Sequence, residues 1–266
     1  MPTMKRYAVA QQVESMEALG QLGGSENLEN DIGLCSIQTI EPHFLKHLPR
    51  TGRILEAGSG RGRWVFYLRR KGFDVIGIDI AKSDLEFGQR FDPSVPLEYD
   101  NVLKTKFADG SFAAVISLGV VEHFENGPQP AFAEVMRLLK PGGLFLVTVP
   151  TQNIGRVLLF NHIKRIQNAV RKLRGVRLAF EEYRYSRSHF TRLLKEAGFE
   201  IVDMAPDDFL PPKNMGLYTD SRFLHNPSVQ WELNTPGRIL ARIANACSPW
   251  AACSGTLWVC RKPARV

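Results

Sequence analysis

The sequence predicts an α/β fold in which a parallel sheet is covered by helices on both faces. Short apolar segments of strand length alternate with segments of helix length along much of the chain. The apolar segments are nearly continuous rather than alternating, which is typical of parallel strands buried on both faces. A glycine-rich turn also joins the first of these strands to the helix that follows it.

The first 50 residues are predicted to form a helical cap before the sheet begins. Residues 37–48 predict a helix that ends at Pro49, and a helical preface and loop are expected before it. The preface rests on apolar residues at helix-like spacing, namely Val9, Val13, Met16, Leu19 and Leu22.

Residues 51–150 carry the regular alternation of strands and helices. Strands are expected at residues 53–57, 73–79, 96–99, 113–118 and 144–149, and helices at residues 64–70 and 129–139. This segment is therefore the predicted core of the fold.

The rest of the chain continues this core with two insertions. Residues 188–266 are expected to add a helix at 188–197, a strand at 199–204 and a last strand at 256–261. The gaps at 151–187 and 205–255 are too long for simple loops, so each should contain helices of its own. We interpret the first gap as a basic helical insertion or lid.

Charge is concentrated in one segment of the 266-residue chain. Seven of its 34 Lys and Arg residues lie between Arg156 and Arg177 with no acid among them, which leaves 27 basic and 27 acidic residues elsewhere. One basic segment on an otherwise neutral chain argues against a surface that coats nucleic acid. No apolar run approaches the roughly 20 residues of a membrane-spanning helix. Because the first residues also lack a signal-peptide core, the expected location is the cytoplasm.

The basic segment also carries an apolar stripe at helical spacing, and Gly175 is a plausible end for the helix. The stripe consists of Leu159, Ile163, Ile166, Val170 and Leu173. Three interpretations remain open: a lid helix packed through its stripe, a helix on a membrane surface or lipid-linked substrate, and a basic face for RNA or a phosphorylated acceptor. An additional RNA-recognition domain is not evident, which disfavours the last.

The turn after the first strand is the most informative motif. Glu56 precedes three glycines in the spacing G-x-G-x-G, and Asp79 ends the next strand. Glycines let the backbone approach a ligand closely, and the carboxyl ends of parallel strands are where ligands bind in such sheets. A dinucleotide fingerprint has the spacing G-x-G-x-x-G, whereas here the third glycine comes one residue earlier, at Gly62. A pyrophosphate would also not favour the acid at Glu56. A cofactor that bears an ammonium and a sulfonium would tolerate that acid.

With these features the chain resembles the class I S-adenosylmethionine-dependent methyltransferases. The resemblance rests on the E-x-G-x-G-x-G turn at 56–62, Gly77-Ile-Asp79, Asp100, and the segments 108–124, 138–144 and 189–199. It implies a Rossmann-like, seven-stranded, mostly parallel sheet with flanking helices, whose last strand at 256–261 is antiparallel. It also implies a helical insertion and a C-terminal elaboration. Ala113 departs from the family, which usually has an acid there in a structural role.

The resemblance further implies the residues that bind S-adenosyl-L-methionine. The implied set is Glu56, Gly58, Gly60, Gly62, Asp79, Ile80, Asp100, Asn101 and Leu118. In such a site the glycines pass under the methionine moiety, Glu56 lies near its ammonium group and Asp79 holds the ribose. Ile80 packs on the adenine, and Asp100 and Asn101 flank the edge of the adenine ring. The backbone around Leu118 contacts the methionine end.

The residues that act on the methyl acceptor are less defined by the sequence. His123 follows the fourth strand at the cofactor end and could take a proton from the acceptor, although the pattern favours a purely structural role. Tyr183, Tyr185 and His189 are candidates for the acceptor pocket. So are further aromatic residues and a histidine at 207–235, which could instead form the core of a subdomain: Phe209, Tyr218, Phe223, His225 and Trp231. No metal site is predicted, because no metal-binding set of acids is evident.

These features predict a methyltransferase that acts on O, N or C of a small metabolite or lipid-linked acceptor. Three alternatives remain: a non-catalytic partner subunit that binds the cofactor, an RNA-directed methyltransferase that uses residues 156–177, and a dehydrogenase. The acceptor itself is not readable, because specificity lies in insertions rather than in the shared motifs.

Overall fold

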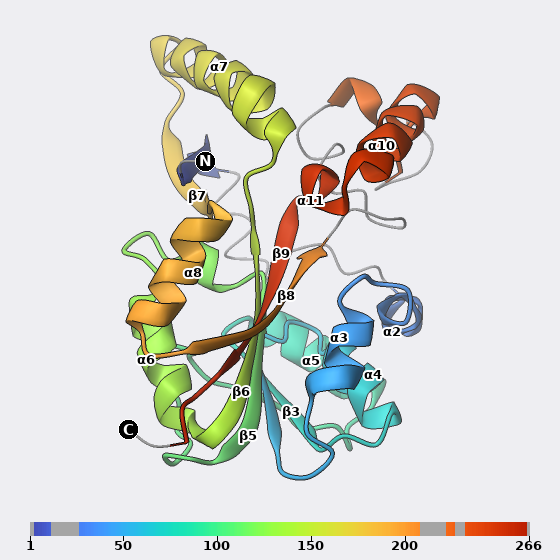
Figure 1. The fold of residues 1–266 in the computed structure, drawn as a ribbon, viewed down its shortest axis with the longest axis vertical. Coiled ribbons are helices and arrows are strands. Elements are labelled where there is room, and N and C mark those ends of the chain that lie inside the picture. The colour runs from blue at the N-terminus through green and yellow to red at the C-terminus, as the bar shows by residue number, and fades with distance from the viewer. Residues whose placement is uncertain (1–2, 12–26, 208–221, 227–231, 265–266) are drawn as a thin grey trace.

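A seven-stranded sheet forms the centre of the computed structural model, which describes residues 3–11, 27–207, 222–226 and 232–264 (Figure 1). Its strand order is β4-β3-β2-β5-β6-β9-β8. The strands are β2 (Ile54–Ala57), β3 (Val75–Asp79), β4 (Leu97–Tyr99), β5 (Phe112–Leu118), β6 (Leu139–Pro150), β8 (Glu200–Asp207) and β9 (Gly255–Arg261). The first five strands in this order, from β4 to β6, pair in parallel with their neighbours, whereas β9 is antiparallel to both β6 and β8. The predicted fold class, with its antiparallel last strand, is confirmed.

Helices cover the two faces of this sheet and create two hydrophobic cores. One core involves α2 (Leu28–Cys35), α3 (Glu41–His47), α4 (Arg63–Arg70) and α5 (Lys82–Phe91), and the other involves α6 (Gln129–Leu138) and α8 (Arg187–Glu196). Successive strand residues point to opposite faces, so Ile54 joins the first core and Leu55 the second. This explains the continuous apolar segments in the sequence. Helix α5 was not predicted, and α3 begins four residues later than the predicted start at Ile37.

Two strands outside the main sheet correct the sequence prediction. β1 (Met4–Val9) and β7 (Leu178–Arg184) form an antiparallel pair, whereas a helical preface and a helical insertion were expected there. Their pairing is stabilised by contacts across the ladder: Arg6 Nη1 donates to Glu182 Oε1 at 2.9 Å, and Tyr7 packs edge-on against Phe180. The other apolar residues of the preface, from Val13 onward, lie outside the described residues.

The basic segment is helical from Arg156, as a short π-helical stretch η2 (Arg156–Phe160) followed by α7 (Asn161–Leu173). Gly175 follows with φ of 75°. The apolar stripe does not pack against the described protein, because none of the α7 side chains is buried. Among the described residues nothing covers the stripe, so the lid interpretation, in which the helix packs through it, stays a prediction.

The second insertion contains η3 (Arg222–Leu224), α10 (Thr235–Cys247) and α11 (Pro249–Ala252) in its described part. Helices α7 and α10 lie at the same end of the molecule, at the top of Figure 1. Among the described residues, no helix combines the length and apolarity needed to cross a membrane.

Candidate functional site

Several of the predicted cofactor residues meet at one edge of the sheet. Glu56 lies in β2, Asp79 ends β3, Asp100 follows β4 and Leu118 ends β5. These four strands are neighbours and run parallel, so their carboxyl ends lie side by side. Figure 1 shows helices α7 and α10 beyond this end of the sheet, to which β6 also leads.

The glycine turn after β2 has the backbone geometry that only glycine adopts readily. Gly58, Gly60 and Gly62 have φ values of 85°, 53° and 82°. Asp79 fixes the turn from the next strand, because its Oδ2 accepts the Gly60 N–H at 2.7 Å and its Oδ1 accepts the Ala81 N–H at 2.8 Å. The carboxylate is thereby held in one orientation at the edge of the sheet, with lone pairs remaining for a ligand hydroxyl.

Glu56 lies beneath this turn as a buried acid with an incomplete set of partners. Its Oε2 is buried and has no hydrogen-bond partner, whereas the Val65 backbone N–H bonds the carboxyl group. Burial raises the pKa of Glu56 to about 8, and the positive charge of Arg63 offsets only part of this effect. An ammonium group would supply the missing partner and stabilise the ionised acid. The residues present therefore fit the methionine end of S-adenosylmethionine.

The adenine side of the predicted site is only partly as expected. Ile80 is exposed beside Asp79, as a residue that packs on a ring should be. Asp100 and Asn101 lie at the edge, but Asp100 Oδ2 accepts the Lys106 N–H at 3.0 Å and Asn101 Oδ1 accepts a backbone N–H in its own loop. The sequence prediction omitted Tyr99, an exposed aromatic residue at the end of β4. Its position one residue before Asp100 was the available signal.

His123 lies at the end of the short 3₁₀ helix η1 (Val121–His123), which follows β5 in the chain. Its Nδ1 forms a 2.8 Å hydrogen bond with the Glu181 carbonyl oxygen of β7, which leaves Nε2 as the acceptor in the neutral ring. Burial alone would lower the pKa of His123, but the negative charge of Glu122, the hydrogen bond to the Glu181 carbonyl and the charges of Glu182 and Glu181 together outweigh burial and raise it. The histidine is thus anchored to β7 and paired electrostatically with an acid.

Glu122 is a second buried acid, and the sequence prediction assigned it no role. Its Oε2 has no hydrogen-bond partner in the structure, and burial raises its pKa to about 7. It also lies close enough to Tyr185 to raise the pKa of that phenol further, beyond the effect of burial. The position of Glu122 next to His123 in the motif was a signal, but its burial required the structure.

The three predicted acceptor residues differ in what they are free to bind. Tyr183 donates its hydroxyl to the Glu125 carbonyl at 2.9 Å, and His189 Nδ1 is hydrogen-bonded to Thr3 Oγ1 at 2.6 Å. Tyr185 is buried, stacks on Tyr183 and has a hydroxyl with no hydrogen-bond partner. Tyr185 is therefore the strongest of the three candidates for binding the methyl acceptor.

Of the aromatic and histidine candidates at 207–235, Phe223 is exposed and His225 forms an isolated bridge with Leu233. The remaining ones, Phe209, Tyr218 and Trp231, lie outside the described residues.

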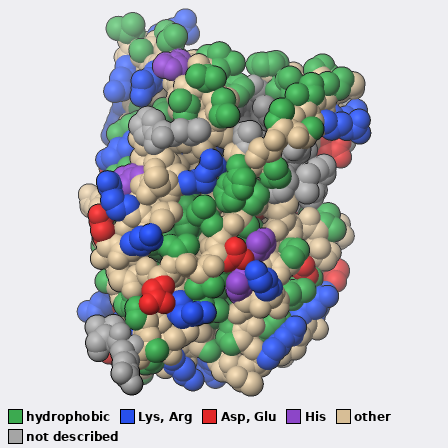
Figure 2. Space-filling view, in the orientation of Figure 1, with side chains coloured by type: hydrophobic (Ala, Val, Ile, Leu, Met, Phe, Trp, Pro, Cys, Tyr) green, Lys and Arg blue, Asp and Glu red, His purple; other side chains and the backbone are tan. Residues whose placement is uncertain are grey.

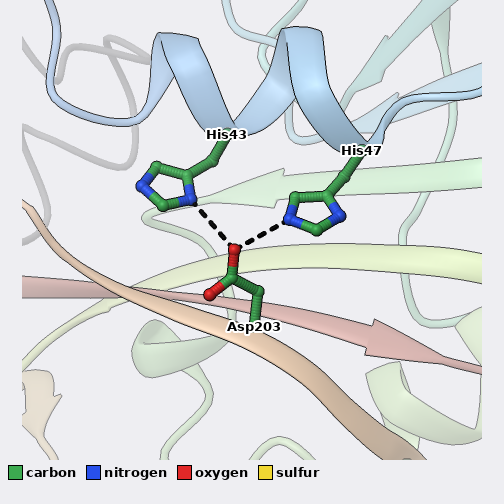
Figure 3. Close-up of side chains that lie close together, drawn as sticks. All are labelled: His43, His47 and Asp203. Atoms are coloured by element: carbon green, nitrogen blue, oxygen red, sulfur yellow. Dashed lines mark hydrogen bonds and ion pairs between the residues drawn. The ribbon is translucent and has the colours of Figure 1, made fainter.

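A separate group of polar side chains joins α3 to β8 (Figure 3). Asp203 Oδ2 lies 3.3 Å from His43 Nδ1 and 2.8 Å from His47 Nε2, and these ligand-type atoms lie close enough together to hold a metal ion. Lys46 Nζ lies 3.2 Å from the same oxygen and competes with a cation there. We interpret the group as an ion-pair anchor for α3.

Comparison with known proteins identifies the family. The methyltransferase-domain family matches residues 36–204, and the chain belongs to this family. It is 28% identical over 153 residues to a protein of Mycolicibacterium smegmatis named as an S-adenosylmethionine-dependent methyltransferase, covering 56% of this chain and 52% of that protein. It is 34% identical over 96 residues to the demethylmenaquinone methyltransferase of Renibacterium salmoninarum, covering 36% and 40% of the two chains. The chain thus spans about half or less of these relatives' own length.

The fold also matches solved methyltransferase structures. A complex of the Haloferax volcanii Trm112 methyltransferase activator with a methyltransferase gives a TM-score of 0.60 at 16% identity, covering 96% of this chain and 98% of the other. At that identity the match supports the fold alone. The predicted family and its cofactor, S-adenosyl-L-methionine, are confirmed by the family match.

Proposed function

We propose that this protein transfers a methyl group from S-adenosyl-L-methionine to O, N or C of a small or lipid-linked acceptor. The observation that carries the proposal is the buried Glu56 carboxyl group, whose Oε2 lacks a partner directly beneath a glycine turn fixed by Asp79. Folding alone would not favour an unpartnered buried acid, whereas an ammonium ligand would.

The chain's own residues would bind and align the reactants. Asp79 would accept hydrogen bonds from the ribose hydroxyls, Glu56 would pair with the ammonium group, and Ile80 would pack on the adenine. The bound sulfonium supplies the methyl group: its carbon–sulfur bond breaks as the bond to the acceptor forms, and S-adenosylhomocysteine remains. The protein contributes alignment and exclusion of water to such an in-line displacement.

A proton must leave an acceptor hydroxyl or amine during this step, and His123 is the proposed group that takes it. The Glu181 carbonyl holds Nδ1, so Nε2 carries the lone pair. Glu122 would stabilise the resulting imidazolium by its charge. Tyr185 would orient the acceptor through the hydroxyl that has no partner within the protein.

The class of acceptor is part of the proposal. A relative named for demethylmenaquinone supports a small acceptor with apolar character. The exposed stripe of α7 supports peripheral membrane contact through residues 156–177 from the cytoplasmic side. A nucleic-acid acceptor is disfavoured, because the basic residues of this segment are interleaved with an apolar stripe.

The test is calorimetric titration with S-adenosylhomocysteine, followed by a turnover assay that detects this product with candidate acceptors. Micromolar binding by the wild type, weakened about tenfold or more in Asp79→Ala, is expected. The matched control Asp74→Ala removes an exposed acid at the opposite end of β3 and should bind as the wild type does. Binding of a nicotinamide dinucleotide instead would identify a dehydrogenase. Binding without turnover on any acceptor would favour a non-catalytic partner subunit.

A further inference from the structure

Helices α7 and α10 expose apolar side chains at the same end of the molecule. Both lie at the top of Figure 1, and Figure 2 shows hydrophobic side chains along this end with Lys and Arg among them. The exposed apolar residues of η2 and α7 are Leu158 (72%), Leu159 (51%), Ile163 (40%), Ile166 (66%), Val170 (41%) and Leu173 (89%). Those of α10 are Ile239 (52%), Leu240 (47%) and Ile243 (57%). We call these residues, with the basic residues between them, the α7–α10 surface.

Helix α7 is oriented opposite to an ordinary surface helix. Its polar residues Asn161, Lys164, Asn168 and Arg171 recur every three or four positions and are half-buried toward the protein. Asn161 donates to the Gln152 side chain at 3.0 Å, and Asn168 donates to a backbone carbonyl of β1 at 3.4 Å.

The apolar stripe of α7 occupies the opposite side of the helix and faces outward. A surface helix of a globular protein normally turns its apolar stripe to the core. The reversed orientation indicates an apolar partner outside the described protein.

The charge of the α7–α10 surface is of one sign. Neither helix contains Asp or Glu, and six Lys and Arg residues in and just after the helices are exposed: Arg165, Lys172, Arg174, Arg177, Arg238 and Arg242. Like charges on two copies of this surface would repel one another, which disfavours self-association. RNA would pair with the cations but would leave the apolar side chains in water. An anionic membrane satisfies both features.

We propose that the α7–α10 surface docks on an anionic phospholipid membrane, with its apolar side chains in the interface and its Lys and Arg residues beside lipid phosphates. Docking would bring the carboxyl edge of the sheet to acceptors held in the membrane, and this purpose alone rests on the proposed function. Two separate helices contribute, so the surface fixes the orientation of the protein as well as its attachment.

The experiment is flotation of the full chain with vesicles of phosphatidylcholine, with or without phosphatidylglycerol. The wild type is expected to bind the anionic vesicles at least about tenfold more tightly, and more weakly as salt rises. The double variant Ile166→Asn with Leu173→Asn should lose about tenfold or more in binding, and so should Arg165→Gln with Lys172→Gln. The controls are Ile37→Asn, which changes another exposed apolar side chain (56%) outside this surface, and Lys195→Gln on α8. Both should bind as the wild type does.

Two results would overturn the proposal: wild-type protein that stays unbound in the presence of anionic vesicles, or variants that bind as well as the wild type. A dimer in light scattering that only Ile166→Asn with Leu173→Asn dissociates, without vesicle binding, would assign the surface to a second copy. Titration of the same preparations with S-adenosylhomocysteine separates this inference from the proposed function. Vesicle binding without cofactor binding would refute the proposed function and support the proposed membrane docking. Cofactor binding without vesicle binding would support the proposed function and refute the docking.

Discussion

The buried carboxyl group of Glu56 predicts that one substitution, Glu56→Gln, strengthens the fold and weakens cofactor binding. Burial raises the pKa of Glu56 to about 8 from its ordinary value of 4.5, so the folded protein retains a proton in this range that the unfolded chain has lost. The stability of the wild type therefore falls as the pH rises between these values, by up to about 1.4 kcal/mol per pH unit. Between pH 4.5 and neutral pH the loss is about 3 kcal/mol.

Glutamine is neutral at every pH, so the variant should lack this loss. Urea unfolding across the range from about pH 5 to about pH 8 should show a smaller fall in stability for Glu56→Gln than for the wild type. The raised pKa of Glu122 lowers the stability of both proteins over this range, so the difference between their pH profiles is the quantity that reports on Glu56. The same variant loses the ion pair with the cofactor ammonium, which should weaken S-adenosylhomocysteine binding about 10- to 100-fold. Wild-type binding at neutral pH should also release a proton, detectable as a calorimetric enthalpy that depends on the buffer.

The control is Glu86→Gln, which removes an exposed acid of α5 and should change neither stability nor affinity. Equal pH dependence of unfolding in Glu56→Gln and the wild type, together with equal affinity for S-adenosylhomocysteine, would refute the reasoning. It would mean that Glu56 is ionised in the free protein or that the ammonium group binds elsewhere.

Four further substitutions test other parts of the structure. Gly58→Ala should lower stability by about 1 to 3 kcal/mol in urea unfolding, because Gly58 has φ of 85° and an added Cβ would lie 2.3 Å from Val120 Cγ2. Tyr185→Phe removes a buried hydroxyl without a partner, so the stability should hold or rise by about 1 kcal/mol while KM for the acceptor increases. Glu122→Gln should move the rise in kcat with pH to lower pH, because the negative charge of Glu122 raises the pKa of His123 and His123 must be neutral to take the proton. In Asp203→Asn the protein should be less stable at neutral pH. Hydrogen bonds from α3 and from the Met204 backbone N–H together outweigh burial and hold the Asp203 pKa below its usual value. The difference should therefore shrink as acid protonates the wild-type carboxylate, and chemical denaturation at several pH values would measure it.

The cofactor half of the site could be predicted because it depends on local sequence and on one general property of parallel sheets. The glycine turn follows directly from a strand and precedes a helix, so its place in the chain fixes its place in the fold. Glu56 and Asp79 lie at strand ends, and the ends of neighbouring parallel strands meet. Side-chain orientation was less predictable: the Asp100 and Asn101 oxygens turn back into their own loop.

The acceptor half could not be predicted, because it depends on pairing between distant segments. β1 and β7 lie about 170 residues apart, and neither carries a strand pattern strong enough to override a helical interpretation. That pairing supports the strand to which His123 is bonded and which Tyr185 directly follows. The stripe of α7 was likewise visible in the sequence, but the direction in which it faces depends on contacts with Gln152 and β1.

The features that the fold leaves unsatisfied indicate where this protein binds other molecules. At the carboxyl edge, Glu56, Ser59, Glu122 and Tyr185 each bury a side-chain oxygen without a hydrogen-bond partner, at a cost to stability. On α7 the fold exposes a continuous apolar stripe and turns polar side chains inward. Both arrangements are unfavourable for the isolated chain, and each becomes favourable with a partner of opposite character: an ammonium or a polar acceptor for the first, and an apolar, anionic surface for the second. Substitutions that relieve these costs should therefore stabilise the protein or increase its solubility while they reduce binding.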